Sequence, residues 1–151
     1  MRLKDLLQVE NVILDLAATS RDEVISGLVD AVIGQVPLTK EKLARILIER
    51  ENQAPTAMSG GVAVPHGRLA ELDHFVLAIG RSRNGVNFGE KEEATKIFFL
   101  LIAPAGDTVT HLKVLARIAR ICRSESFRQD IMAAESARRI YERVIREDEQ
   151  I

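Results

Sequence analysis

Gly60–Leu69 (GGVAVPHGRL) is the segment of this chain whose residue types are best suited to chemistry. His66 follows a proline and precedes a glycine at the end of a short apolar run. Pro65 fixes its own φ and favours an extended conformation at Val64. Gly67 leaves room for the backbone to turn away or for a bound group to approach. The pattern predicts an imidazole held in one direction at an accessible edge; the alternative is a turn histidine satisfied by the backbone.

A neutral imidazole has one nitrogen with a free lone pair, and the hydrogen bond made by the other nitrogen decides which one it is. The free nitrogen can act as a base, bind a metal or attack phosphorus as a nucleophile. The Pro-His-Gly motif is too short to select among these roles, which stay open at this level.

Arg50 is a second candidate, because it lies on the predicted inward stripe of its helix, four residues after Ile46 and three after Leu47. A guanidinium on an apolar stripe is rarely buried without an anionic partner. It can bind a phosphoryl group through two parallel hydrogen bonds. Alternatively, it interacts with the carboxyl-terminal end of the helix dipole and extends to water.

His111 is the third candidate and lies near the predicted start of a helix. It begins an inward stripe that continues through Leu115, Ile118 and Cys122. A helix start favours anions and disfavours an imidazolium, so a neutral His111 could donate a hydrogen bond to an incoming phosphate. A satisfied core histidine is the alternative.

The other reactive side chains carry weaker signals. His74 precedes a strand and is expected at the surface, and Cys122 is expected to be a small buried hydrophobe. Lys113, Arg117 and Arg120 form a basic line on the predicted outer face of the His111 helix, either solvated or used for docking a partner.

Several mechanistic classes lack their sequence signatures. No HExxH spacing supports a zinc hydrolase, no GxSxG supports a serine hydrolase, and no Walker-type phosphate loop is present. The lone cysteine excludes an internal disulfide and a CxxC metal knuckle. We therefore expect no cofactor and no metal.

The elements that would position these residues alternate between helix and strand. Ser20 and Glu23 form a capping-box pair before a helix that ends near Gly34, and Thr39 is a plausible cap for the next helix. Helices are predicted at Leu38–Glu51, Asp107–Arg123, Phe127–Ala133 and Ala137–Arg146. Strands are predicted at Val12–Leu16, His74–Arg81 and Lys96–Ala103, with loop and short strand over Asn52–Gly67 and a turn at Arg83–Gly85. Because Lys96–Ala103 is apolar on both faces, we expect a three-layer α/β sandwich with a central sheet flanked by helices.

Composition limits the remaining possibilities. The chain has 151 residues, 46% of them hydrophobic, which suits one domain spanning residues 1–151 with a single core. A net charge of −1 and six aromatic residues argue against binding nucleic acid. The longest apolar run, Ile97–Ala103, is too short to cross a membrane, and the amino terminus does not resemble a signal peptide. We expect a soluble, cytoplasmic protein without membrane insertion.

The sequence resembles the fructose/mannitol-type (type-2) enzyme IIA domain of the bacterial phosphotransferase system, including its nitrogen-regulatory branch. The resemblance covers nearly the whole chain and centres on RENQAPTAMSGGVAVPHGRL (Arg50–Leu69) and IFFLLIAPAGDTVTHLKVLARIA (Ile97–Ala119). One departure is Ala57–Gly60, where the family often has a more glycine-rich run. The amino-terminal LLQVENVILDLAATSRDEVISGLV (Leu6–Val29) looks like the nitrogen-regulatory branch.

The resemblance implies an α/β sandwich with a mixed sheet and a phosphorelay. His66 would be the phosphorylated histidine, His111 the second active-site histidine, and Arg50 the arginine near the phosphoryl group. The implied donor is the phosphocarrier HPr or its nitrogen-branch counterpart, docking over apolar residues such as Val62, Leu69 or Met58.

Three functions remain open on this basis. The first is a nitrogen-regulatory phosphoryl carrier that acts on target proteins. The second is a sugar-specific enzyme IIA that passes phosphate to a IIB permease subunit. The third is a binding module that has lost phosphotransfer.

Overall fold

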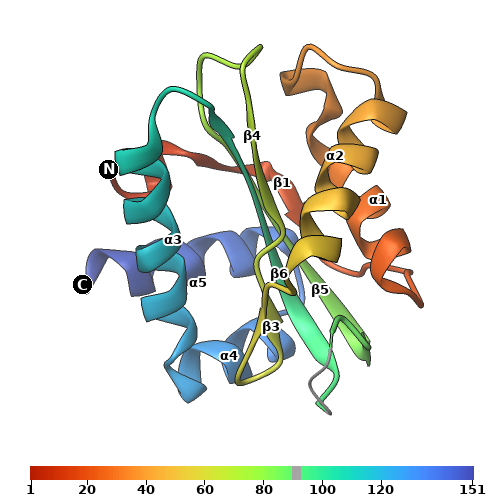
Figure 1. Cartoon of the computed structure of the whole chain (residues 1–151). Helices are drawn as coiled ribbons and strands as arrows, with labels where there is room; N and C mark the ends of the chain where they lie inside the picture. The colour runs from red at the N-terminus through yellow and green to blue at the C-terminus, as the bar shows by residue number, and fades with distance from the viewer. Residues whose placement is uncertain (90–92) are drawn as a thin grey trace.

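The nearly unbroken apolar run that ends at Pro104 forms the central strand of a mixed β-sheet in the computed structural model (Figure 1). The structure describes residues 1–89 and 93–151, and within them the sheet has six strands. They are β1 (Leu7–Ile13), β2 (Ala57–Met58), β3 (Val62–Ala63), β4 (His66–Leu69), β5 (Val76–Val86) and β6 (Thr95–Pro104). β6 pairs antiparallel with β5 on one side and parallel with β3 and β4 on the other. β1 pairs with β5 in parallel and β2 with β3 in antiparallel orientation.

Helices cover both faces of this sheet. The α-helices are α1 (Arg21–Val32), α2 (Lys40–Gln53), α3 (Thr108–Cys122), α4 (Glu125–Ala133) and α5 (Ala137–Glu149), with short 3-10 helices at Leu3–Asp5 and Ile33–Gln35. α1 and α2 lie on one face and α3, α4 and α5 on the other (Figure 1). Ser20 and Thr39 cap α1 and α2 by accepting backbone N–H bonds, as predicted. The expected three-layer α/β sandwich is confirmed.

β6 supplies side chains to both cores, because successive residues of a strand point to opposite faces. Ile97, Phe99 and Leu101 pack with α3, α4 and α5. Phe98 and Leu100 pack with α1 and α2 on the opposite face. The two cores therefore hold the sheet in place from both sides.

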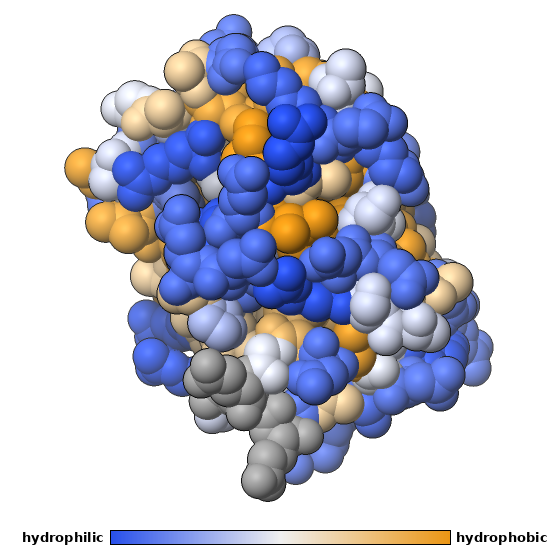
Figure 2. All heavy atoms as spheres, turned by 45° about the vertical axis from the view of Figure 1, so that its right-hand side comes forward, coloured by the Kyte–Doolittle hydropathy of each residue, from blue (hydrophilic) through white to orange (hydrophobic). Residues whose placement is uncertain are grey.

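On the face seen in Figure 2, polar residues predominate and apolar residues appear only as small separate areas.

Two sequence predictions about strands are wrong. The first strand is β1, which begins at Leu7 and ends at Ile13 instead of covering Val12–Leu16. The predicted turn at Arg83–Gly85 lies within β5. The β5–β6 register shifts between Arg81 and Val86, and Gly85 adopts a φ of 79°. The turn-like residues therefore form an irregularity inside the strand and not a turn between two strands.

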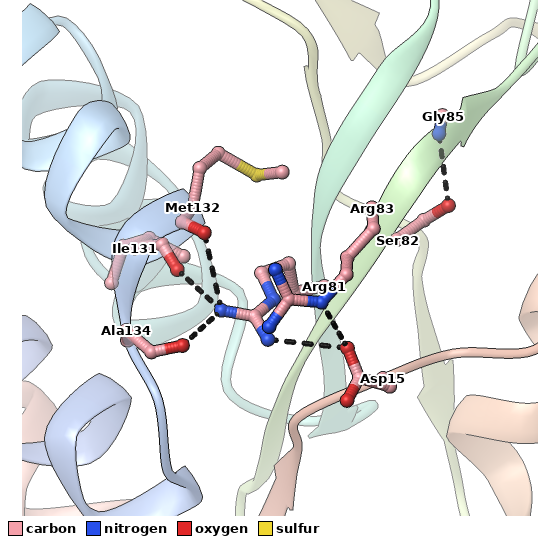
Figure 3. A network of polar contacts seen from close by, with 8 residues as sticks. All are labelled: Asp15, Arg81, Ser82, Arg83, Gly85, Ile131, Met132 and Ala134. Carbon is pink, nitrogen blue, oxygen red and sulfur yellow. Dashed lines mark hydrogen bonds and ion pairs between the residues drawn. The ribbon is translucent and has the colours of Figure 1, made fainter.

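Arg81 connects the sheet to α4 from a fully buried position (Figure 3). Its Nη1 donates to the carbonyls of Ile131, Met132 and Ala134, at the carboxyl-terminal end of α4. Its Nη2 donates to Asp15 Oδ1 at 3.1 Å. A helix end leaves carbonyl groups without partners and carries partial negative charge. The guanidinium donates hydrogen bonds to these carbonyls, and its positive charge offsets the negative end of the helix dipole.

We expect Arg81→Met to lower the free energy of unfolding by about 3 kcal/mol, because the carbonyls of Ile131, Met132 and Ala134 lose the buried guanidinium as a donor. Urea-induced unfolding measures this loss. Arg83→Met is the matched control, since Arg83 also contacts Asp15 at 3.1 Å but has a side chain that is 58% exposed. The control should lose less than about 1 kcal/mol. Equal losses in the two variants would contradict the capping role of Arg81.

Candidate functional site

Pro65 separates β3 from β4 and thereby determines how His66 is held. Proline has no N–H to contribute to a strand ladder. Its carbonyl still accepts a bond from Leu101 N at 3.1 Å, and His66 pairs with Leu101 in the register of β4 and β6. The Val64 carbonyl lies 2.6 Å from His66 Nδ1. Since a carbonyl only accepts, Nδ1 carries the hydrogen and Nε2 carries the free lone pair.

Gly67 serves packing rather than a turn. It lies within β4 and has no positive φ. A Cβ at this position would lie 3.3 Å from Leu47 Cδ2, on α2. Glycine therefore lets α2 approach β4 closely, next to His66.

Arg50 reaches His66 from α2. Its Nη2 lies 3.3 Å from His66 Nε2, and its Nη1 donates to the Ala54 carbonyl at 3.0 Å. A guanidinium only donates, so Nε2 must be the acceptor, in agreement with a hydrogen on Nδ1. Arg50 therefore points into the site and also satisfies a carbonyl just beyond the helix end. Its binding of a phosphoryl group stays a prediction.

Glu51, next to Arg50, fixes the segment that follows α2. It is buried and accepts bonds from Thr56 N at 2.6 Å and from Thr56 Oγ1 at 2.9 Å. Burial raises the pKa of Glu51, while the two bonds from Thr56 act in the opposite direction. This pair was not predicted from the sequence, and it anchors the loop containing Ala54, the partner of Arg50.

His111 enters the site from α3, on the opposite face of the sheet. Its ring is buried, with 3% exposure, and its centroid lies 5.5 Å from that of His66 at an interplanar angle of 78°. Asp107 caps this helix by accepting a bond from Thr110 N at 3.1 Å. The three side chains predicted from the sequence therefore meet at one place, although they come from α2, β4 and α3.

Arg68 is a further site residue, which was not predicted from the sequence. Its Nε donates to His111 Nδ1 at 3.0 Å, and its Nη1 donates to Thr108 Oγ1 at 3.1 Å. The available signal was its position two residues after His66, which places both side chains on the same face of a strand. Within the described part of the chain, His111 Nε2 is buried and has no hydrogen-bond partner.

The electrostatics of the site favour neutral imidazoles. Burial lowers the pKa of His66 below 6.5, and Arg50 and Arg68 lower it further, while the bond to Val64 opposes this. Burial lowers the pKa of His111 to about 4, and His66, Arg68 and Arg50 contribute in the same direction. At neutral pH the site therefore presents one nucleophilic nitrogen surrounded by N–H donors and cations.

The remaining candidates lie elsewhere. His74 is exposed and contacts Asp73, and Cys122 is buried, with burial raising the pKa of its thiol to about 12. The basic line is not one solvated face: Arg117 turns to the buried Asp148 of α5, with Nε 2.8 Å from Oδ1. Lys113 remains exposed.

The apolar residues expected to contact a docking partner around the site are not the residues that the structure exposes. Val62 is 0% exposed and Leu69 is 3% exposed, because both side chains belong to the cores, and Met58 is partly buried. Val109 and Leu112, which flank His111 in α3, are instead 65% and 57% exposed. The exposed large apolar side chains of α3 thus lie in its first turns, close to His111 in sequence.

Two further properties concern the described residues 1–89 and 93–151. No helix in them has both the length and the apolar character needed to cross a membrane. No group of three or more His, Cys, Asp and Glu side chains in them is arranged to hold a metal ion.

Comparison with known proteins identifies relatives over nearly the whole chain. Residues 5–147 match the family described as phosphoenolpyruvate-dependent sugar phosphotransferase system, EIIA 2. The nitrogen regulatory protein of Bradyrhizobium diazoefficiens is 30% identical over 142 residues, covering 93% of each chain. The fructose-specific EIIABC component of Bacillus subtilis is 26% identical, covering 90% of this chain and 22% of that protein. The crystal structure of the nitrogen regulatory protein IIA-Ntr from Neisseria meningitidis has a TM-score of 0.89 and 25% identity, covering 94% of this chain and 98% of that one.

The two site histidines should titrate below the usual histidine range. We expect a midpoint of about 4 for His111 and a midpoint below 6.5 for His66, because burial and the neighbouring guanidiniums disfavour the imidazolium. NMR titration of the ring Cε1–H signals measures both values. A midpoint at or above 6.5 for either ring would contradict this electrostatic account.

Proposed function

Since this chain belongs to the phosphoenolpyruvate-dependent sugar phosphotransferase system EIIA 2 family, we propose that it is a phosphoryl carrier that accepts a phosphoryl group on Nε2 of His66. One observation carries the proposal. The bond from His66 Nδ1–H to the Val64 carbonyl leaves the Nε2 lone pair on the side of Arg50. A nucleophile prepared in this way needs no metal and no separate base.

The transfer step conserves atoms and charge. Arg50 Nη2, which donates to Nε2 in the resting site, turns to a phosphoryl oxygen as the lone pair of Nε2 forms the new N–P bond. The N–P bond of the donor phosphohistidine breaks, and its electron pair returns to the donor imidazole. His66 keeps its hydrogen on Nδ1, where the Val64 carbonyl stabilises the positive charge of the phosphorylated ring. Positioning and charge neutralisation supply most of the catalysis in such transfers.

The product carries about two negative charges at neutral pH, by analogy with other phosphorylated residues. Arg50 is close enough to neutralise part of this charge, since its Nη2 already lies 3.3 Å from the attacking nitrogen. His111 is the second donor, because its buried Nε2 has no other partner among the described residues. Both groups interact more strongly with the phosphoryl group than with the neutral ring.

The donor that we propose is an HPr-type phosphohistidine protein. It must dock over the site, and the exposed side chains of Val109 and Leu112 provide apolar contact area next to His111. Apolar residues at the centre of an interface with a polar rim are typical of protein docking surfaces.

We propose the nitrogen-regulatory branch as the setting of this chemistry, with other proteins as the regulated targets. Its support is the similarity to two nitrogen regulatory proteins along more than nine-tenths of the chain. The second candidate is a sugar-specific enzyme IIA that passes phosphate to a IIB subunit, and the fructose-specific relative favours it. Movement of labelled phosphate from the phosphorylated protein onto a IIB subunit would identify the sugar-specific function.

Incubation with labelled phosphoenolpyruvate, enzyme I and HPr, or the nitrogen-branch counterparts of these two proteins, tests the carrier function. We expect wild type to acquire acid-labile, alkali-stable label and His66→Ala to acquire none, because the acceptor nitrogen is removed. His74→Ala is the matched control and should be labelled like wild type, since His74 is exposed and its side-chain hydrogen bond among the described residues goes to Asp73. Absence of label on wild type would favour a binding module, and label on His66→Ala would assign the chemistry elsewhere.

Substitution of the supporting side chains should slow transfer without unfolding the protein. We expect Arg50→Ala and His111→Ala each to lower the phosphorylation rate of His66 by about 100-fold, the usual effect of removing one donor to a developing negative charge. Rapid-quench measurement of labelled protein gives the rates. Arg45→Ala is the control, because Arg45 is an exposed arginine on the same helix. Rates equal to wild type in both site variants would refute the roles assigned to Arg50 and His111.

A further inference from the structure

Arg68 joins β4 to the first turn of α3 through two hydrogen bonds. One bond goes to His111 Nδ1 and the other to Thr108 Oγ1, at 3.0 Å and 3.1 Å. Thr108 is the first residue of α3, so the guanidinium fixes both the helix start and the histidine that lies on it. Arg68 itself is exposed, whereas the ring that it contacts is buried.

The bond to His111 determines which ring nitrogen carries the hydrogen. A guanidinium is always charged and only donates, so Nδ1 of His111 must accept with its lone pair. The hydrogen of the neutral ring then lies on Nε2. This Nε2–H is buried and lacks a partner in the described residues 1–89 and 93–151. A buried donor without a partner is costly in a resting protein and becomes useful when an acceptor arrives.

We propose that Arg68 is a positioning residue that holds His111 in the Nε2–H tautomer, so that this ring donates to the phosphoryl group on His66. The inference rests on the proposed function. Without Arg68, the hydrogen of His111 can move to Nδ1, and Nε2 then presents a lone pair toward phosphoryl oxygens. A donor would become a repulsive acceptor at the position where negative charge develops.

Nitrogen-15 NMR of the unphosphorylated protein at neutral pH tests the tautomer directly. We expect wild-type His111 to show a protonated Nε2 and an unprotonated Nδ1. In Arg68→Met the two nitrogen shifts should move toward each other as both tautomers become populated. Arg68→Lys should restore the wild-type pattern, because an ammonium can also donate to Nδ1. Arg45→Met is the exposed-arginine control, and unchanged shifts in Arg68→Met would overturn the proposal.

A double-mutant cycle separates positioning from direct contact with the phosphoryl group. If Arg68 acts through His111, Arg68→Met should lower the phosphorylation rate about tenfold or more in the wild-type background. In the His111→Ala background the same change should alter the rate less than about twofold. Equal losses in both backgrounds would overturn the proposal, because Arg68 would then act on the phosphoryl group itself.

The NMR experiment also separates this inference from the proposed function. It needs no phosphoryl donor, so it reports the tautomer of His111 even if His66 accepts no phosphate. Absence of label on wild type would therefore refute the carrier function and the phosphoryl part of this inference together. Loss of the Nε2–H tautomer in Arg68→Met would still show that Arg68 controls the tautomer of His111. Its retention would show that Arg68 does not.

Discussion

The hydrogen bond between His66 Nδ1 and the Val64 carbonyl is the interaction on which the site depends, and Pro65 is what makes it available. In an uninterrupted strand, both neighbours of a central residue take part in the ladder. Here β3 ends at Ala63 and β4 begins at His66, so the Val64 carbonyl can accept from the imidazole. The backbone thus sets the tautomer of His66 and leaves the lone pair on Nε2, the atom that we propose as the nucleophile. This is why a strand interruption lies at the centre of the site.

The two histidines are held in opposite tautomers by different means. A backbone carbonyl keeps the hydrogen of His66 on Nδ1, and the guanidinium of Arg68 keeps the hydrogen of His111 on Nε2. One ring therefore has a lone pair on Nε2 and the other a hydrogen on Nε2, which is the difference that the proposed transfer uses. Because burial lowers the pKa of both rings, neither gains a second proton at neutral pH that would abolish this difference.

The sequence predicted those features of the fold that local residue patterns determine. The burial of β6 on both faces and the caps at Ser20 and Thr39 follow from residue pattern and type. The convergence of Arg50 and His111 on His66 was expected from the family resemblance, and the roles of these three side chains stay predictions. Contacts between distant elements were not encoded in this way. Arg117 looked solvated because its partner Asp148 lies on another helix, 31 residues later. Arg68 carried no periodic signal apart from its spacing from His66.

The resting site contains cationic side chains without carboxylate partners. Among the described residues, neither Arg50 nor Arg68 forms an ion pair with an aspartate or glutamate. Glu51 is adjacent in sequence but is directed to Thr56. A neighbouring carboxylate would neutralise these guanidiniums in the resting state and would repel the negative phosphoryl group. By turning Glu51 away, the fold leaves the positive charge of Arg50 available for an anion at His66 and leaves Arg68 bonded to His111. The negative charge of a phosphoryl group on Nε2 would then be stabilised without prior rearrangement of an ion pair.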